Sequence, residues 1–144
     1  MASRTMSGRT MTFGLQEKAI RFRIMAGGGS WATPVIVGGR GTHPTLAGQG
    51  VAPGVAQVIK SGAGKFTITL EDAFARLVTA QASYQGSGDA EDLVAQVGQI
   101  LNVGTSSPVV LAIKTKAGAA NTDPATSDAN TSISVDLVFE DSNG

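Results

Sequence analysis

The sequence predicts an all-β protein: an antiparallel β-sandwich, jelly-roll-like, with one short helix and an extended Gly-rich N-terminal arm. Apolar and polar residues alternate in 65–70 (KFTITL) and in 131–140 (TSISVDLVFE), as they do in strands with one buried face. Five strand-like segments lie between residues 65 and 140, separated by turn-rich gaps. Of the 19 glycines, 13 lie in the first 64 residues, which disfavours dense regular structure there.

We divide the chain near residue 60 into an extended, basic, Gly/Pro-rich arm (1–59) and a sandwich body (60–144). Glycine inside a regular element costs about 0.5–1 kcal/mol relative to alanine, so the arm is expected to be mostly extended chain and loops. Trp31 and its apolar neighbours need cover, so parts of the arm are expected to order only against a surface. Short strands are expected in the arm at 19–25, 35–37 and 55–60.

The body opens with a strand at 65–70, in which three apolar side chains share one face. Residues 71–76 are predicted to form one helical turn, because Asp72 lies where an acid favours the N-terminal helix dipole. Alternation resumes in 77–85, which is predicted to be a strand. The alternative joins 71–85 into one helix, because its apolar residues also fit helical spacing.

Three further strands are expected at 93–101, 109–116 and 131–140, and the polar segment 117–130 is predicted to be a long loop. Gly98 marks a bulge or a close backbone approach in the first of them. The apolar faces of the first and last body strands are expected to pair in one core. Their seven apolar side chains contribute roughly 1.5–3 kcal/mol each before entropy is subtracted, so oligomerisation would add useful stability.

Composition restricts the function more than it identifies it. The chain has 144 residues, enough for one domain with one core. It has no cysteine, which excludes disulfides and thiolate metal sites. No run of about 18 apolar residues is present, so no membrane span is expected. The N-terminal stretch also lacks the apolar segment of a secretory signal.

Charge is distributed unevenly although the net charge is zero. Residues 1–65 hold eight basic residues and one acid, a formal charge of +7, whereas residues 66–144 hold three basic residues and ten acids, a formal charge of −7. Such separation is typical of a basic arm that docks on an acidic surface. That surface can belong to the same chain or to a partner, and the sequence leaves both interpretations open.

No segment carries a catalytic signature. The segment SGAGKF fails the phosphate-loop pattern, because Ile59 replaces its first glycine and Phe66 its hydroxyl residue. His43 is the single histidine, and it lies in GTHPT with no nucleophile motif beside it. We therefore expect neither enzymatic activity nor a cofactor.

Two other patterns have structural interpretations. The acidic clusters at 89–92 and 121–130 offer oxygen ligands, but Ala125 breaks the EF-hand spacing, so both are interpreted as solvated loops and no metal is expected. The segment IRFRI, residues 20–24, alternates basic and apolar residues. Its arginines fit phosphate contacts or the outward side of an edge strand, and we favour the edge strand.

The segments GKFTITLEDAFARLVTAQASYQ, DLVAQVGQI, VVLAIKT and NTSISVDLVFEDS follow one another in this order. Together they resemble a family of small virion structural proteins of tailed bacteriophages, usually encoded near head genes. The likeness covers roughly residues 60–144, and residues 1–59 show none. It implies a virion component of the capsid decoration (cement) type, made in the host bacterial cytoplasm and bound to the capsid exterior.

The resemblance and the charge layout together predict a protein that binds the major capsid protein and stabilises the DNA-filled head. A homo-oligomer, a trimer, is expected, because joined copies bind multivalently even when each contact is weak. Neither a membrane nor direct nucleic-acid binding is expected. The residues expected to dock on the capsid are the basic residues of the arm: Arg4, Arg9, Lys18, Arg21, Arg23 and Arg40.

Three alternatives remain open at this point. One is a tail or head–neck structural component, and another is a receptor-binding or glycan-binding module. A glycan site needs exposed aromatic side chains, and only Trp31 and Tyr84 are offered for it. The third is a nucleic-acid-binding accessory protein that uses the basic arm, which the net neutrality of the chain disfavours.

Overall fold

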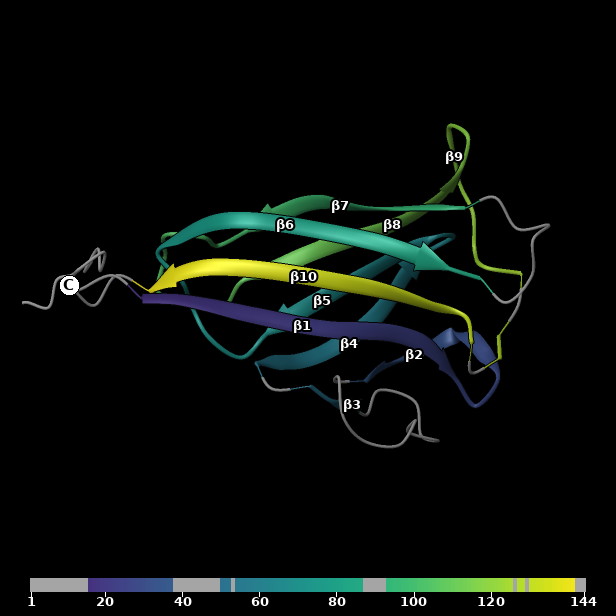
Figure 1. The fold of residues 1–144 in the computed structure, drawn as a ribbon, viewed down its shortest axis with the longest axis horizontal. Coiled ribbons are helices and arrows are strands. Elements are labelled where there is room, and N and C mark those ends of the chain that lie inside the picture. Colours follow the sequence, from purple (N-terminus) through teal and green to yellow (C-terminus); the bar gives the residue numbers. More distant parts are fainter. Residues whose placement is uncertain are drawn as a thin grey trace, which may run out of the picture.

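The computed structural model describes residues 16–37, 50–52, 54–86, 93–125, 127–128 and 130–141. Within these ranges the chain forms ten strands and no helix, arranged in two sheets (Figure 1). The all-β prediction is therefore confirmed.

The first sheet joins strands from both ends of the described chain. Its order is β3 (Gly50–Val51), β2 (Ser30–Val37), β1 (Gln16–Gly27), β10 (Ser132–Asp141) and β6 (Arg76–Gln85). Every ladder in it is antiparallel except the short β2–β3 pair. The long β1–β10 ladder, from Gln16↔Asp141 to Ile24↔Ile133, places the first described strand beside the last.

The second sheet is built from strands closer together in sequence. Its order is β4 (Val55–Gly62), β5 (Lys65–Leu70), β8 (Val110–Ala117) and β7 (Val94–Leu101), with β9 (Ala120–Asn121) also paired to β8. All its ladders are antiparallel. In Figure 1 the strands β1, β10 and β6 pass in front of β5 and β8.

One core lies between the two sheets. The apolar face of β5 and the apolar face of β10 both belong to it, as expected from their alternation. Phe66 and Ile68 of β5 are fully buried, and so are Leu137 and Phe139 of β10. The alternate residues point away from this core, which is why period-2 sequences of this kind form strands here.

β1 and β2 lie within the segment expected to be an arm, and both contribute to the same core. Phe22 and Ile24 of β1 are buried in it, and the Trp31 ring of β2 lies 5.7 Å from the Phe66 ring between centroids. The edge-strand interpretation of IRFRI fails at Arg23 and Ile24, which pair with both β2 and β10, whereas residues 20–22 pair with β10 alone within the described part of the chain. Its arginines nevertheless point outward, as alternation requires.

The helical turn predicted for 71–76 is not formed. The backbone there makes long-range hydrogen bonds instead: Glu71 N–H donates to Gly54 O (2.9 Å), and Val109 N–H donates to Asp72 O (3.2 Å). Phe74 is buried and stacks on Phe139 with ring centroids 4.5 Å apart. The segment therefore crosses from β5 to β6, in the other sheet, with several of its backbone groups hydrogen-bonded to distant parts of the chain.

The other body strands match their expected positions within one or two residues. Gly98 was expected to mark a bulge or a close backbone approach, and the β7–β8 register shifts between Val97 and Ile100, around this glycine. The segment 117–130, expected to be a loop without strands, contains the two-residue strand β9. A strand this short leaves no alternation for the sequence to show.

Candidate functional site

The outer face of the first sheet carries the exposed arginines of β1. Because Phe22 points into the core, Arg21 and Arg23 point to the opposite side. The β1–β10 register places Arg21 opposite Asp136 and Arg23 opposite Ser134. Four polar side chains from two central strands thus form two adjacent rows on one surface.

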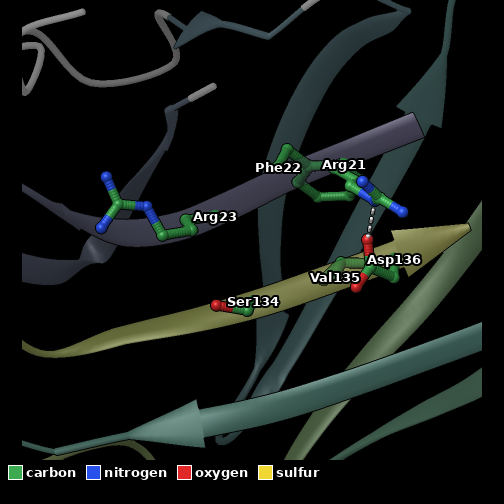
Figure 2. A pocket seen from close by; sticks show the side chains of 6 residues that line it. All are labelled: Arg21, Phe22, Arg23, Ser134, Val135 and Asp136. Atoms are coloured by element: carbon green, nitrogen blue, oxygen red, sulfur yellow. Dashed lines mark ion pairs between the residues drawn. The ribbon is translucent and has the colours of Figure 1, made fainter. Parts of the chain in front are cut away.

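Arg21 is oriented by an ion pair across these strands. Its Nε lies 2.8 Å from Asp136 Oδ1, and the two side chains are 77% and 54% exposed (Figure 2). Exposed pairs of this kind contribute only about 0–1 kcal/mol to stability. The pair therefore matters more for orienting the guanidinium than for holding the fold.

Arg23 has a different environment. No ion pair joins it to any other residue that the structure describes, and its cross-strand neighbour Ser134 has a short side chain. A shallow surface hollow of about 220 Å³ lies here. Its lining consists of Arg21, Phe22, Arg23, Ser134, Val135 and Asp136 (Figure 2).

The charges of this hollow favour an anionic group. Two guanidinium groups and one carboxylate leave a net charge of +1, and Ser134 adds a hydroxyl that can donate or accept a hydrogen bond. A guanidinium presents paired donors that match the two oxygens of a carboxylate, and this geometry gives strong, directional contacts. The site is therefore suited to an acidic side chain on a protein surface.

The structure brings together only some of the expected docking residues. Arg21 and Arg23 share the hollow, and Lys18 lies on the same strand and is exposed. Arg4, Arg9 and Arg40 lie outside the described residues. Ser134 and Asp136 were not among the expected site residues. The alternation in the sequence shows that both residues share the polar side of β10, but it does not show that β1 lies beside this strand.

The acidic cluster at 121–130 serves a structural purpose. Asp123 accepts a hydrogen bond from Gly64 N–H (2.6 Å) and forms an ion pair with Lys60. Partial burial acts to raise the pKa of Asp123, but the hydrogen bonds from Lys60 and Gly64 and the Lys60 charge outweigh it, so the pKa lies below its ordinary value. The segment after β9 is thereby fastened to the β4–β5 turn.

The other residues considered as candidate sites are either buried or half-buried, or lie outside the described part of the chain. Trp31 is buried, so it offers no exposed ring to a sugar, and Tyr84 is half-buried. His43 lies outside the described residues. Among the described residues, no three acidic or histidine side chains come together as a metal site. No helix in the described ranges has the length and hydropathy to cross a membrane.

Comparisons with known proteins identify no relative. No family model matches the chain, and neither a curated protein nor a solved structure matches it.

Proposed function

We propose that this chain is a bacteriophage virion structural protein of the capsid decoration type, which binds the outer capsid lattice and stabilises the DNA-filled head. The proposal begins from the resemblance of residues 60–144 to small virion proteins encoded near head genes. A two-sheet body that exposes two arginines at one surface hollow is compatible with a binding role of this kind.

One observation assigns the proposed binding to a particular surface. Arg21 and Arg23 both point outward and line the shallow hollow on the first sheet. Its two rows lie on β1 and β10. β10 is paired on both sides, and β1 pairs with β10 at both arginines and with β2 from Arg23 onward. Two guanidinium groups held at one hollow of a sheet bind acidic side chains on a repeating protein lattice without a large ordering cost. We assign this face to the contact with the major capsid protein.

For the fold, we propose the β-sandwich class, because two sheets enclose one core. The pairing of β1 with β10 is compatible with jelly-roll winding. The ladders β1–β2, β4–β5 and β7–β8 join consecutive strands instead, so the jelly-roll-like detail stays a prediction.

Capsid binding is tested by co-sedimentation with undecorated phage heads. Removal of the first thirty residues would delete β1, so point substitutions are the sharper tool. We expect the wild-type chain to sediment with the heads and the double variant Arg21→Ala/Arg23→Ala to lose at least about tenfold in affinity, equivalent to about 1.4 kcal/mol.

The matched control is Lys65→Ala/Lys116→Ala, which removes the same charge from the second sheet. It is expected to bind like the wild type. Failure of the wild-type chain to sediment with heads would overturn the proposed function. Equal losses in both double variants would show that net charge, rather than this face, governs binding.

A further inference from the structure

The two sheets end in edge strands with different degrees of protection. In the first sheet the outermost strands are β3 and β6, and in the second they are β4 and β7. Edge strands present unpaired backbone groups, and proteins protect them with charges, bulges or short length. The four edges of this molecule can be compared by these devices.

Three of the edges are protected. β3 has only two residues. β4 carries Lys60, and its register against β5 shifts near both ends. β7 is interrupted by the bulge between Val97 and Ile100. Each of these interrupts or shortens the row of backbone groups that another strand would need.

β6 lacks comparable protection. It has ten residues, and from Leu77 to Gln85 it carries no charged side chain and no proline. Its register against β10 is regular from Thr79 to Gln85, with the one shift confined to its beginning. Among the described strands only β10 pairs with it, so its other side faces no ladder partner in the described chain.

Exposed apolar side chains lie on β6 and on its neighbour β7. Leu77 and Val78 of β6 are 36% and 47% exposed, and Leu101 and Val94 of the neighbouring strand β7 are 46% and 61% exposed. These are four of the five large apolar side chains that are exposed among the described residues. β6 and β7 are in contact, although no ladder joins them. Apolar groups at an open strand edge mark a place where another chain associates.

We propose that the β6 edge pairs antiparallel with the β6 edge of a second copy, so that two first sheets become one continuous sheet across a two-fold axis. The register that places Gln81 opposite Gln81 of the second copy also places Ala80 opposite Ala82 and Thr79 opposite Ser83. Val78 then faces Tyr84 of the second copy. Small side chains flank the central Gln81 pair and larger ones meet toward the ends, which suits cross-strand packing.

The charge pattern selects a second copy as the occupant. Because β6 is uncharged from Leu77 to Gln85, a basic or acidic partner strand would form no ion pairs with it. The β6 strand of a second copy can pair with it without like-charge repulsion. Identical edges that pair about a two-fold axis satisfy each other's backbone groups reciprocally. This contact gives an even number of subunits, in contrast to the trimer expected from the sequence.

Sedimentation velocity on the purified full-length chain tests the pairing without phage heads. The wild type is expected at the mass of two copies. Gln81→Lys is expected at the mass of one, because it places two ammonium groups opposite each other. The control Gln57→Lys makes the same change on the β4 edge and is expected to stay at two. A wild type that is monomeric or trimeric, or a Gln81→Lys variant still at two copies, would overturn the proposal.

A cysteine cross-link provides a second test that does not depend on disrupting the edge. The chain has no cysteine, so a single introduced thiol reports alone. Directly opposed residues in antiparallel strands have Cα atoms about 4.5–5.5 Å apart, within the range of a disulfide. Under mild oxidation Gln81→Cys is expected to form a covalent dimer, and Ala63→Cys, in the β4–β5 turn, is expected to remain uncross-linked.

Equal cross-linking of both variants, or none in Gln81→Cys, would contradict the two-fold pairing. Because no capsid is present, failure here leaves capsid binding unaffected.

Discussion

Phe74 determines how the chain passes from the second sheet to the first. Its ring is buried and nearly parallel to Phe139, at an interplanar angle of 12°. Its carbonyl accepts a hydrogen bond from Gly104 N–H at 2.8 Å. The side chain and the backbone of Phe74 thus both fix the segment between β5 and β6, which was predicted to form a helical turn. The sequence shows an aromatic residue there, but not the ring on which it stacks.

Replacing Phe74 by alanine is expected to lower the free energy of unfolding by about 3–5 kcal/mol, because it leaves a cavity beside Phe139. Chemical denaturation measures the change. The control Ile59→Ala removes an apolar side chain that is 51% exposed on β4 and is expected to cost less than about 1 kcal/mol. Similar losses in the two variants would show that the Phe74 ring is not a core element.

Asp123 gives the stability a defined pH dependence. The pKa of Asp123 is lowered in the fold, so its contribution is fully present above the unfolded pKa, about 3.8, and disappears as the pH falls through the folded pKa. The difference in unfolding free energy between the wild type and Asp123→Asn is therefore expected to be largest near neutral pH. It should shrink below about pH 4 in urea titrations. A difference that stays constant from pH 7 to pH 3 would contradict the assigned role.

At the scale of elements, alternation predicted the strands with one buried face well. β5 matches its predicted bounds, and β6, β7, β8 and β10 differ by one or two residues at their ends. β1 and β2 are longer than expected, because glycine and proline suggested an arm although apolar residues alternate through β1. Local alternation is enough to predict that a segment forms a strand. Whether that strand stays in an extended arm or joins a sheet depends on a partner strand far along the chain.

Gly64, in the β4–β5 turn, packs closely against β8 and the segment after β9. Gly64 has a φ of 59°, and a Cβ there would lie 2.5 Å from Thr115 O and Thr122 N. Gly118 has a φ of 63° and nothing within 4 Å of such a Cβ. Gly118→Ala is expected to cost about 1–2 kcal/mol, from backbone conformation alone. Gly64→Ala should cost about 1–3 kcal/mol more, from overpacking. Equal losses in thermal or urea unfolding would show that the turn is not packed against the segment after β9.

At the scale of the whole molecule, the unequal charge of the two halves is partly resolved within the chain. Arg21 pairs with Asp136 and Lys60 pairs with Asp123, and each pair joins the basic half to the acidic half. Internal docking, one of the two interpretations left open by the sequence, therefore accounts for some of the separation. Arg23 joins no ion pair within the described part of the chain, so its charge is available to a partner.

The sequence contained the residues of the candidate site but not their arrangement. Arg21 and Arg23 were expected to dock on a partner, and their alternation predicted that they share one side of a strand. That Ser134 and Asp136 lie beside them depends on the β1–β10 register, which spans more than a hundred residues of sequence. Long-range pairing of this kind is set by the competition of whole strands for neighbours, and no local pattern records its outcome.

Cryo-electron microscopy of undecorated phage heads incubated with the purified protein tests the central claim most directly. The account predicts added density at regularly repeated lattice positions on the outer shell, with the outer face of the first sheet and its Arg21–Arg23 hollow directed toward the capsid. Heads without added density, or density confined to one vertex or to the tail, would contradict it.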